Sequence, residues 1–80
     1  MIMEELRRLL NDPFWEYPAL TKREREVANL MAFDHTRLEV GVELGISPST
    51  VAVLAGRAKA KLGGKKFTRI LLERIKEIVE

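Results

Sequence analysis

The chain has no cysteine among its 80 residues, which excludes disulfide bonds, cysteine-ligated zinc and thiol catalysis. It has one histidine, His35, so a site built from several histidines is excluded as well, and we predict no metal and no cofactor. No apolar run is long enough to span a bilayer, and we expect a cytoplasmic protein without a membrane partner. The hydroxyl groups of Ser47, Ser49 and Thr50 have no basic partner at catalytic spacing, so we do not expect an enzyme.

Acidic side chains are missing from one long stretch. Residues 44–72 contain six Lys or Arg and no Asp or Glu, whereas residues 1–43 contain six basic and nine acidic residues. The formal net charge of +2 therefore hides two parts of opposite sign. A run of one charge is often only a solvated helix face, but a basic stretch of this length also favours a nucleic-acid partner.

Alternation of apolar and polar residues with period two is also absent, so we predict no strand and an all-α fold. Helices should begin where a threonine precedes a glutamate by three residues, as after Thr21 and Thr36, because this spacing caps two backbone N–H groups. Another should begin at Ser47-Pro48, and Gly45 and Gly63-Gly64 should end helices. The predicted helices cover residues 1–11, 21–33, 36–44, 48–62 and 68–79.

A chain of 80 residues has room for one domain only. Within it, residues 1–19 are expected to form an N-terminal helix and an aromatic loop, and residues 20–79 a four-helix unit. Three of the five aromatic residues, Phe14, Trp15 and Tyr17, fall in that loop. We expect them to cover the core from outside.

Two short helices joined by the tight turn at residues 44–47 form a helix-turn-helix pattern. Gly45 permits the left-handed backbone of the turn, and Gly41 leaves room for the next helix to cross. Ile46 and Val51 should lock the two helices together. The N-terminal end of the second helix then faces outward, where a phosphate can sit.

Several separated motifs fall in the order and spacing of a known family. They are Leu20-Thr21, Arg23-Glu24-Arg25-Glu26-Val27, Leu30, Glu39-Val40-Gly41, Leu44-Gly45-Ile46-Ser47-Pro48-Ser49-Thr50-Val51 and Lys61-Leu62-Gly63. Residues 20–79 resemble the LuxR/GerE-type DNA-binding domain, and through residues 57–62 they are also similar to the last DNA-binding region of sigma factors. The resemblance implies a tetrahelical helix-turn-helix domain with an extra short N-terminal helix. It also implies that the helix beginning at Ser47 enters the major groove, that Thr50 touches phosphate, and that the last helix forms a dimer.

The chain departs from the LuxR pattern after Thr50-Val51, where the family usually has a lysine and, two residues later, a histidine. Here the positions hold Ala52, Val53 and Leu54. By helical spacing we expect an inward set of Val51, Ala55, Ala58 and Leu62 and an outward set of Ser49, Ala52, Val53, Gly56, Arg57 and Ala60. In the outward set, only Ser49 and Arg57 carry hydrogen-bonding groups. We therefore expect a small transcriptional regulator that binds duplex DNA mainly through phosphate contacts. The expected DNA-binding residues are Ser47, Ser49, Thr50, Ala52, Val53, Gly56, Arg57, Lys59, Lys61, Lys65 and Lys66.

Two alternatives concern protein partners. The first is an adaptor, such as a phage or plasmid regulator or a DNA-packaging recognition module, that binds another protein through the small apolar face at Ala52, Val53 and Gly56. The second concerns the last helix, whose apolar side chains cover more of its circumference than one neighbour can bury. Either the first and last helices bury one another within a monomer, or the chain forms a homodimer through Ile70, Leu72, Ile75 and Val79.

Overall fold

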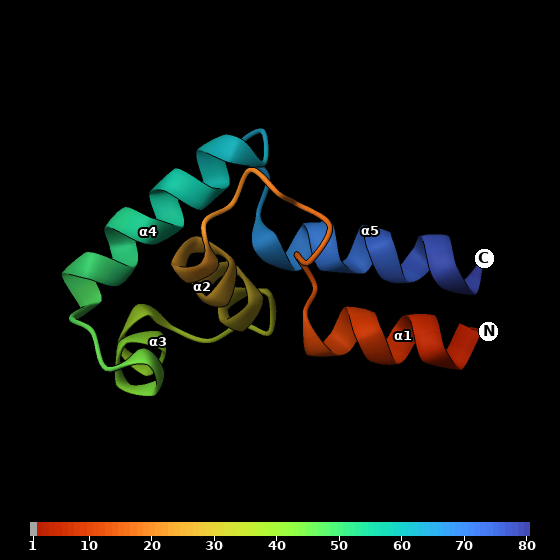
Figure 1. Ribbon diagram of the computed structural model, residues 1–80, viewed down its shortest axis with the longest axis horizontal. Coiled ribbons are helices and arrows are strands. Elements are labelled where there is room, and N and C mark those ends of the chain that lie inside the picture. Colours follow the sequence, from red (N-terminus) through yellow and green to blue (C-terminus); the bar gives the residue numbers. More distant parts are fainter. Residues whose placement is uncertain (1) are drawn as a thin grey trace.

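The computed structural model describes residues 2–80 as five helices, and no strand occurs within that range (Figure 1). The predicted all-α class is therefore confirmed. Met1, the first residue of the predicted N-terminal helix, lies outside the described residues, and the last helix begins one residue earlier than predicted. The helices are α1 (Ile2–Asn11), α2 (Lys22–Ala32), α3 (Arg37–Leu44), α4 (Pro48–Lys61) and α5 (Phe67–Val79).

The two predicted capping boxes are formed. At the start of α2, the Thr21 hydroxyl oxygen accepts a hydrogen bond from the Glu24 N–H at 3.2 Å, and the Thr21 N–H donates to Glu24 Oε1 at 2.9 Å. At the start of α3, Thr36 and Glu39 make the same pair of bonds at 3.2 Å and 2.8 Å. Each box satisfies two N–H groups that a helix start would otherwise leave without a partner, so the local sequence sets where both helices begin.

The turn between α3 and α4 depends on two glycines. Gly45 ends α3 with a φ of 69°, in the left-handed region that costs glycine little. A Cβ atom at Gly41 would lie 2.6 Å from the carbonyl oxygen of Ile46. Gly41 therefore makes room for the turn itself, whereas the sequence predicts that it makes room for the next helix. Among residues 2–80, no single helix is long and apolar enough to cross a membrane, and α3 and α4 reach that length and composition only as a pair bent by 104°.

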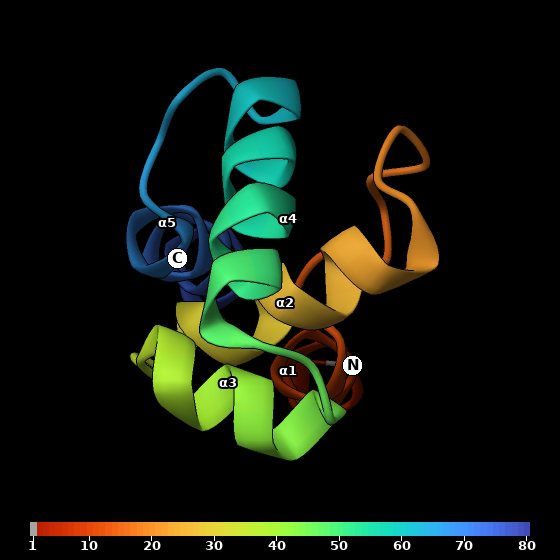
Figure 2. The same ribbon diagram turned by 90° about the vertical axis from the view of Figure 1, so that its left-hand side faces the viewer.

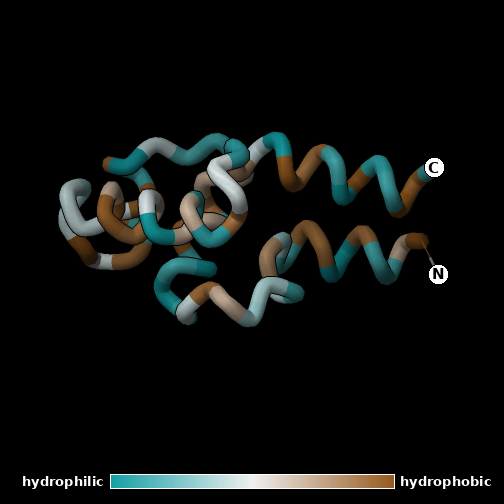
Figure 3. Tube along the Cα trace, turned by 90° about the horizontal axis from the view of Figure 1, so that it is seen from above, coloured by the Kyte–Doolittle hydropathy of each residue, from teal (hydrophilic) through white to brown (hydrophobic). Residues whose placement is uncertain are grey.

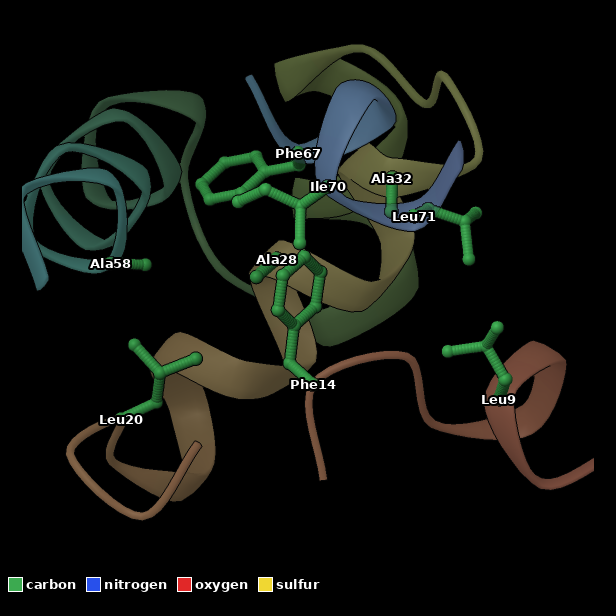
Figure 4. Packing of buried hydrophobic residues seen from close by; sticks show 9 residues of the cluster. All are labelled: Leu9, Phe14, Leu20, Ala28, Ala32, Ala58, Phe67, Ile70 and Leu71. Atoms are coloured by element: carbon green, nitrogen blue, oxygen red, sulfur yellow. The ribbon is translucent and has the colours of Figure 1, made fainter. Parts of the chain in front are cut away.

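The larger of two buried clusters joins the N-terminal segment to α2 and α5. Phe14 lies in its middle, with its ring toward Ile70 and Phe67 (Figure 4). The expectation that the loop aromatics only cover the core is wrong for Phe14, whose side chain is fully buried. Its backbone N–H donates to Asn29 Oδ1 at 3.1 Å, and this bond ties the loop to α2. Trp15 stays 41% exposed, with the Arg8 guanidinium 5.1 Å from its ring.

The smaller cluster lies inside the helix-turn-helix. Val27 of α2, Val40 of α3 and Val51 of α4 are all fully buried, and Ile46 packs against them from the turn. Figure 2 shows α4 lying across α3, with α2 behind both. This contact holds α4 on the surface of the molecule, where only the side of α4 that faces the other helices is covered.

α1 and α5 lie side by side and run in opposite directions, so the start of α1 and the end of α5 are at the same end of the molecule (Figure 1). Apolar residues recur along both helices turn by turn (Figure 3). Leu9 of α1 and Leu71 of α5 are buried within this part of the molecule. The interpretation in which the first and last helices cover one another within a monomer therefore accounts for part of the apolar surface of α5.

Candidate nucleic-acid interface

The start of α4 is capped from within the turn. Ser47 is the N-cap, and its hydroxyl oxygen accepts a hydrogen bond from the Thr50 N–H at 3.1 Å. The two hydroxyl groups of Ser47 and Thr50 also lie 3.0 Å apart, within hydrogen-bond distance. Ser47, Ser49 and Thr50 are exposed, and α4 has no acidic residue in its first turn. The positive end of the helix dipole thus faces solvent beside three hydroxyl groups, an arrangement suited to an anion.

The two faces of α4 differ sharply in burial. Val51 and Ala58 are buried and Ala55 and Leu62 are half-buried, which is the predicted inward set. Of the predicted outward set, Ser49, Val53, Gly56, Arg57 and Ala60 are exposed. Ala52 departs from the predicted outward set because it is half-buried beside α3 and α5. Among the exposed residues of this outward set only Ser49 and Arg57 can form side-chain hydrogen bonds, so the outward face has few groups that can read a base edge.

A groove of about 340 Å³ runs beside this face. Arg37 from the first turn of α3, Lys59 from α4 and Lys66 from the residue before α5 bring three cationic side chains to it. Apolar and small residues form the rest, namely Met31, Ala52, Ala55, Gly56, Phe67 and Thr68. Sequence reasoning missed Arg37 because it lies outside the stretch that lacks acidic residues.

Two of the predicted DNA-binding lysines are already held by carboxylates. Lys61 Nζ lies 2.7 Å from Glu24 Oε1, and Lys65 Nζ lies 3.5 Å from Glu73 Oε2. The Lys61 ammonium and the Thr21 N–H hold the pKa of the Glu24 carboxyl below its usual range. Lys61 therefore has a structural role, because it neutralises the charge of a glutamate side chain that is only 4% exposed.

The other predicted cations have no such partner. Arg57, Lys59 and Lys66 are exposed, and none of them forms an ion pair within residues 2–80. Sequence patterns could not separate these three from Lys61 and Lys65, because Glu24 is 37 positions away from Lys61 along the chain. The structure thus divides one basic stretch into cations that are engaged and cations that are available.

No metal-ligating cluster accompanies this surface in the part of the chain that is described. Within residues 2–80, no three His, Cys, Asp or Glu side chains are placed to hold a metal ion. His35 Nδ1 lies 2.9 Å from the carbonyl oxygen of Leu30, near the end of α2, so its ring has a partner in the backbone.

The predicted dimer residues of α5 are not all on one surface. Ile70 belongs to the monomer core at 6% exposure, and Ile75 is half-buried. Leu72 and Val79 are 60% and 53% exposed. Only these last two, with the open edge of Ile75, are available to a second copy, because Ile70 points into the cluster around Phe14.

A family model described as bacterial regulatory proteins, luxR family, matches residues 18–71. This span runs from just before α2 into the first turns of α5 and includes the whole helix-turn-helix. The chain belongs to the LuxR family of bacterial regulatory proteins. The family resemblance predicted from the sequence is thereby confirmed, while the similarity to sigma factors stays a prediction.

A relative with a curated name supports the same assignment. Spore germination protein GerE of Bacillus subtilis (strain 168) is 43% identical over 60 residues, which cover 75% of this chain and 81% of that protein. No solved structure matches the chain. The LuxR family is a family of regulators rather than of enzymes, in agreement with the lack of catalytic spacing in the sequence.

Proposed function

We propose that this chain is a transcription regulator that binds duplex DNA with α4 in the major groove. The observation that carries the proposal is the exposed face of α4, which the small cluster holds outward and which lies in a 29-residue stretch without a carboxylate, residues 44–72. A helix-turn-helix presents its second helix to DNA in this way. Membership of the LuxR family supports the same function.

Phosphate contacts supply most of the affinity in this proposal. Ser49 and Thr50 at the start of α4 are placed to donate hydrogen bonds to a phosphate, and Arg57 to pair with one from the middle of the helix. Lys59 and Lys66 add further contacts, whereas Lys61 and Lys65 contribute less because their carboxylate partners compete with DNA. Ala52 and Val53 offer only methyl groups, which suit thymine rather than a hydrogen-bonding base edge.

A homodimer is part of the proposal. Leu72 and Val79 lie on a different side of α5 from the core residues Ile70 and Leu71. Together with Ile75 they form an apolar stripe at helical spacing. A two-fold dimer through this stripe would present two copies of α4 to two half-sites on the duplex.

The second candidate is the protein adaptor, and it rests on Val53. This branched apolar side chain is 53% exposed on the outer face of α4, where a protein partner could cover it. The two functions use the same face, so one substitution separates them. If the chain binds DNA, Val53→Glu should weaken DNA binding only, whereas if the chain is an adaptor it should abolish capture of the protein partner.

The test measures fluorescence anisotropy of a labelled mixed-sequence duplex across a range of KCl concentrations. Arg57→Gln should reduce the slope of log K against log salt by about 0.9, the value for one lost phosphate contact. The matched control is Arg7→Gln, which removes the same charge from an exposed position on α1, remote from α4, and should leave the slope unchanged. Absence of binding by the wild-type protein at low salt, or equal slopes for both variants, contradicts the proposed function.

A further inference from the structure

We infer that one strand of the bound duplex runs along the groove between α3, α4 and α5, and that Arg37 contacts a phosphate there. The inference rests on the proposed DNA binding. It adds a residue outside the basic stretch and assigns the phosphate contacts unevenly to the two strands.

The charge of the groove is the first argument. Its cations come from three separate elements, with Arg37 on α3, Lys59 on α4 and Lys66 in the loop before α5, and no carboxylate lines it. None of the three forms an ion pair within residues 2–80. Three unpaired cations around one hollow focus positive potential there, and a polyanion that passes along the groove can meet all three at once.

The shape of the groove is the second argument. Its wall along α4 is made of Ala52, Ala55 and Gly56, and the space that a side chain at Gly56 would fill is open. Small residues on this flank let a sugar-phosphate strand approach the helix closely. Ala52 and Gly56, which cannot hydrogen-bond to a base, therefore also leave space for a strand to pass between Arg37 and Lys59.

The two flanks of α4 are not equivalent. Figure 2 shows the starts of α3 and α5 on one side of α4 and the start of α2 on the other. A helix in a major groove about 12 Å wide has a phosphate strand on each flank. On the α2 flank the ammonium of Lys61 is held by Glu24 at 2.7 Å, which leaves Arg57, one turn earlier on the same face, as the free cation of α4 on that side. The strand on the groove side can meet the three cations Arg37, Lys59 and Lys66.

The experiment extends the salt titration with the same mixed-sequence duplex. Arg37→Gln should lower the slope of log K against log salt by about 0.9, and a triple variant with Lys59→Gln and Lys66→Gln by about three times as much. Arg37→Lys should recover most of the wild-type slope, because the count of released ions follows charge. Arg7→Gln is again the matched control. All three groove cations are exposed, so helix content and thermal midpoint should stay at wild-type values. Arg37→Ala removes the same charge and replaces Arg37→Gln if that variant unfolds.

The outcomes separate this inference from the function on which it rests. Wild-type protein that fails to bind the duplex overturns both. Wild-type binding that Arg57→Gln weakens, with the Arg37→Gln slope equal to that of Arg7→Gln, overturns the strand placement alone. The groove also has an apolar floor at Met31 and Phe67. An oligoglutamate peptide that binds more tightly than the duplex and loses its binding in Arg37→Gln would assign the groove to an acidic protein instead.

Discussion

Replacing Phe14 by alanine tests whether the N-terminal segment is part of the core. Phe14 precedes the residues matched by the LuxR family model, yet it is the largest fully buried side chain in the described structure. Its ring centroid lies 5.9 Å from that of Phe67 in an edge-to-face arrangement and 5.6 Å from that of Tyr17. A substitution at a dispensable extension should leave stability almost unchanged, whereas one at a core residue should not.

The expected loss follows from burial. Truncation of a buried phenylalanine costs about 3–5 kcal/mol, whereas a domain of this length has a total stability of about 4–12 kcal/mol. Phe14→Ala should therefore remove a quarter or more of the free energy of unfolding. Phe14→Leu keeps most of the apolar volume but loses two aromatic contacts, each worth about 0.5–1.5 kcal/mol, and should cost about 1–3 kcal/mol.

Urea unfolding followed by far-ultraviolet circular dichroism measures these losses. The denaturation midpoint should fall with little change in the dependence of free energy on urea. Phe33→Ala is the matched control, since Phe33 is 43% exposed and its removal should cost less than about 1 kcal/mol. If Phe14→Ala lost no more stability than Phe33→Ala, the conclusion that Phe14 is part of the core would be refuted.

Two further predictions concern the ion pair beneath α4 and the α5 stripe. The pKa of Glu24 is lowered by Lys61, so the stability from this pair is present above the ordinary carboxyl value of 4.5 and is lost as pH falls through the lower folded value. Glu24→Gln keeps the capping geometry but not the charge; it should be less stable than wild type at neutral pH in urea unfolding, and the difference should vanish in acid. A difference that is independent of pH would contradict the pairing. For the stripe, Leu72→Arg should lower the mass measured by sedimentation equilibrium from dimer to monomer, and a wild-type protein that is already monomeric at micromolar concentration would refute the proposed dimer.

Local rules were sufficient for the helices and the turn. The capping threonines, the Ser47-Pro48 start and Gly45 each act on backbone groups within four residues, so the sequence predicts the element boundaries closely. The alternation of buried and exposed positions along α4 follows from helical periodicity in the same way. These features, with the separated family motifs, made the helix-turn-helix and the LuxR family predictable.

Contacts between distant residues were not predictable by such rules. Phe14 is held inward by Asn29 on another element, and Ile70 faces the same cluster rather than a second copy. The sequence around Phe14 and Ile70 does not show whether these side chains are buried or exposed. Periodicity shows which residues share a face of a helix, but not what covers that face.

The sequence by itself determined the all-α fold class, the LuxR resemblance and the stretch that carries no acidic residue, and it indicated the helix that we propose faces DNA. The tertiary structure decided which cations within and beside that stretch are free. Lys61 is engaged in an ion pair with Glu24, whereas Arg37, from outside the stretch, lies with Lys59 and Lys66 at one groove. The physical reason is that net charge along a chain is a local sum, whereas the field that a phosphate meets depends on which side chains the packing of three helices brings together.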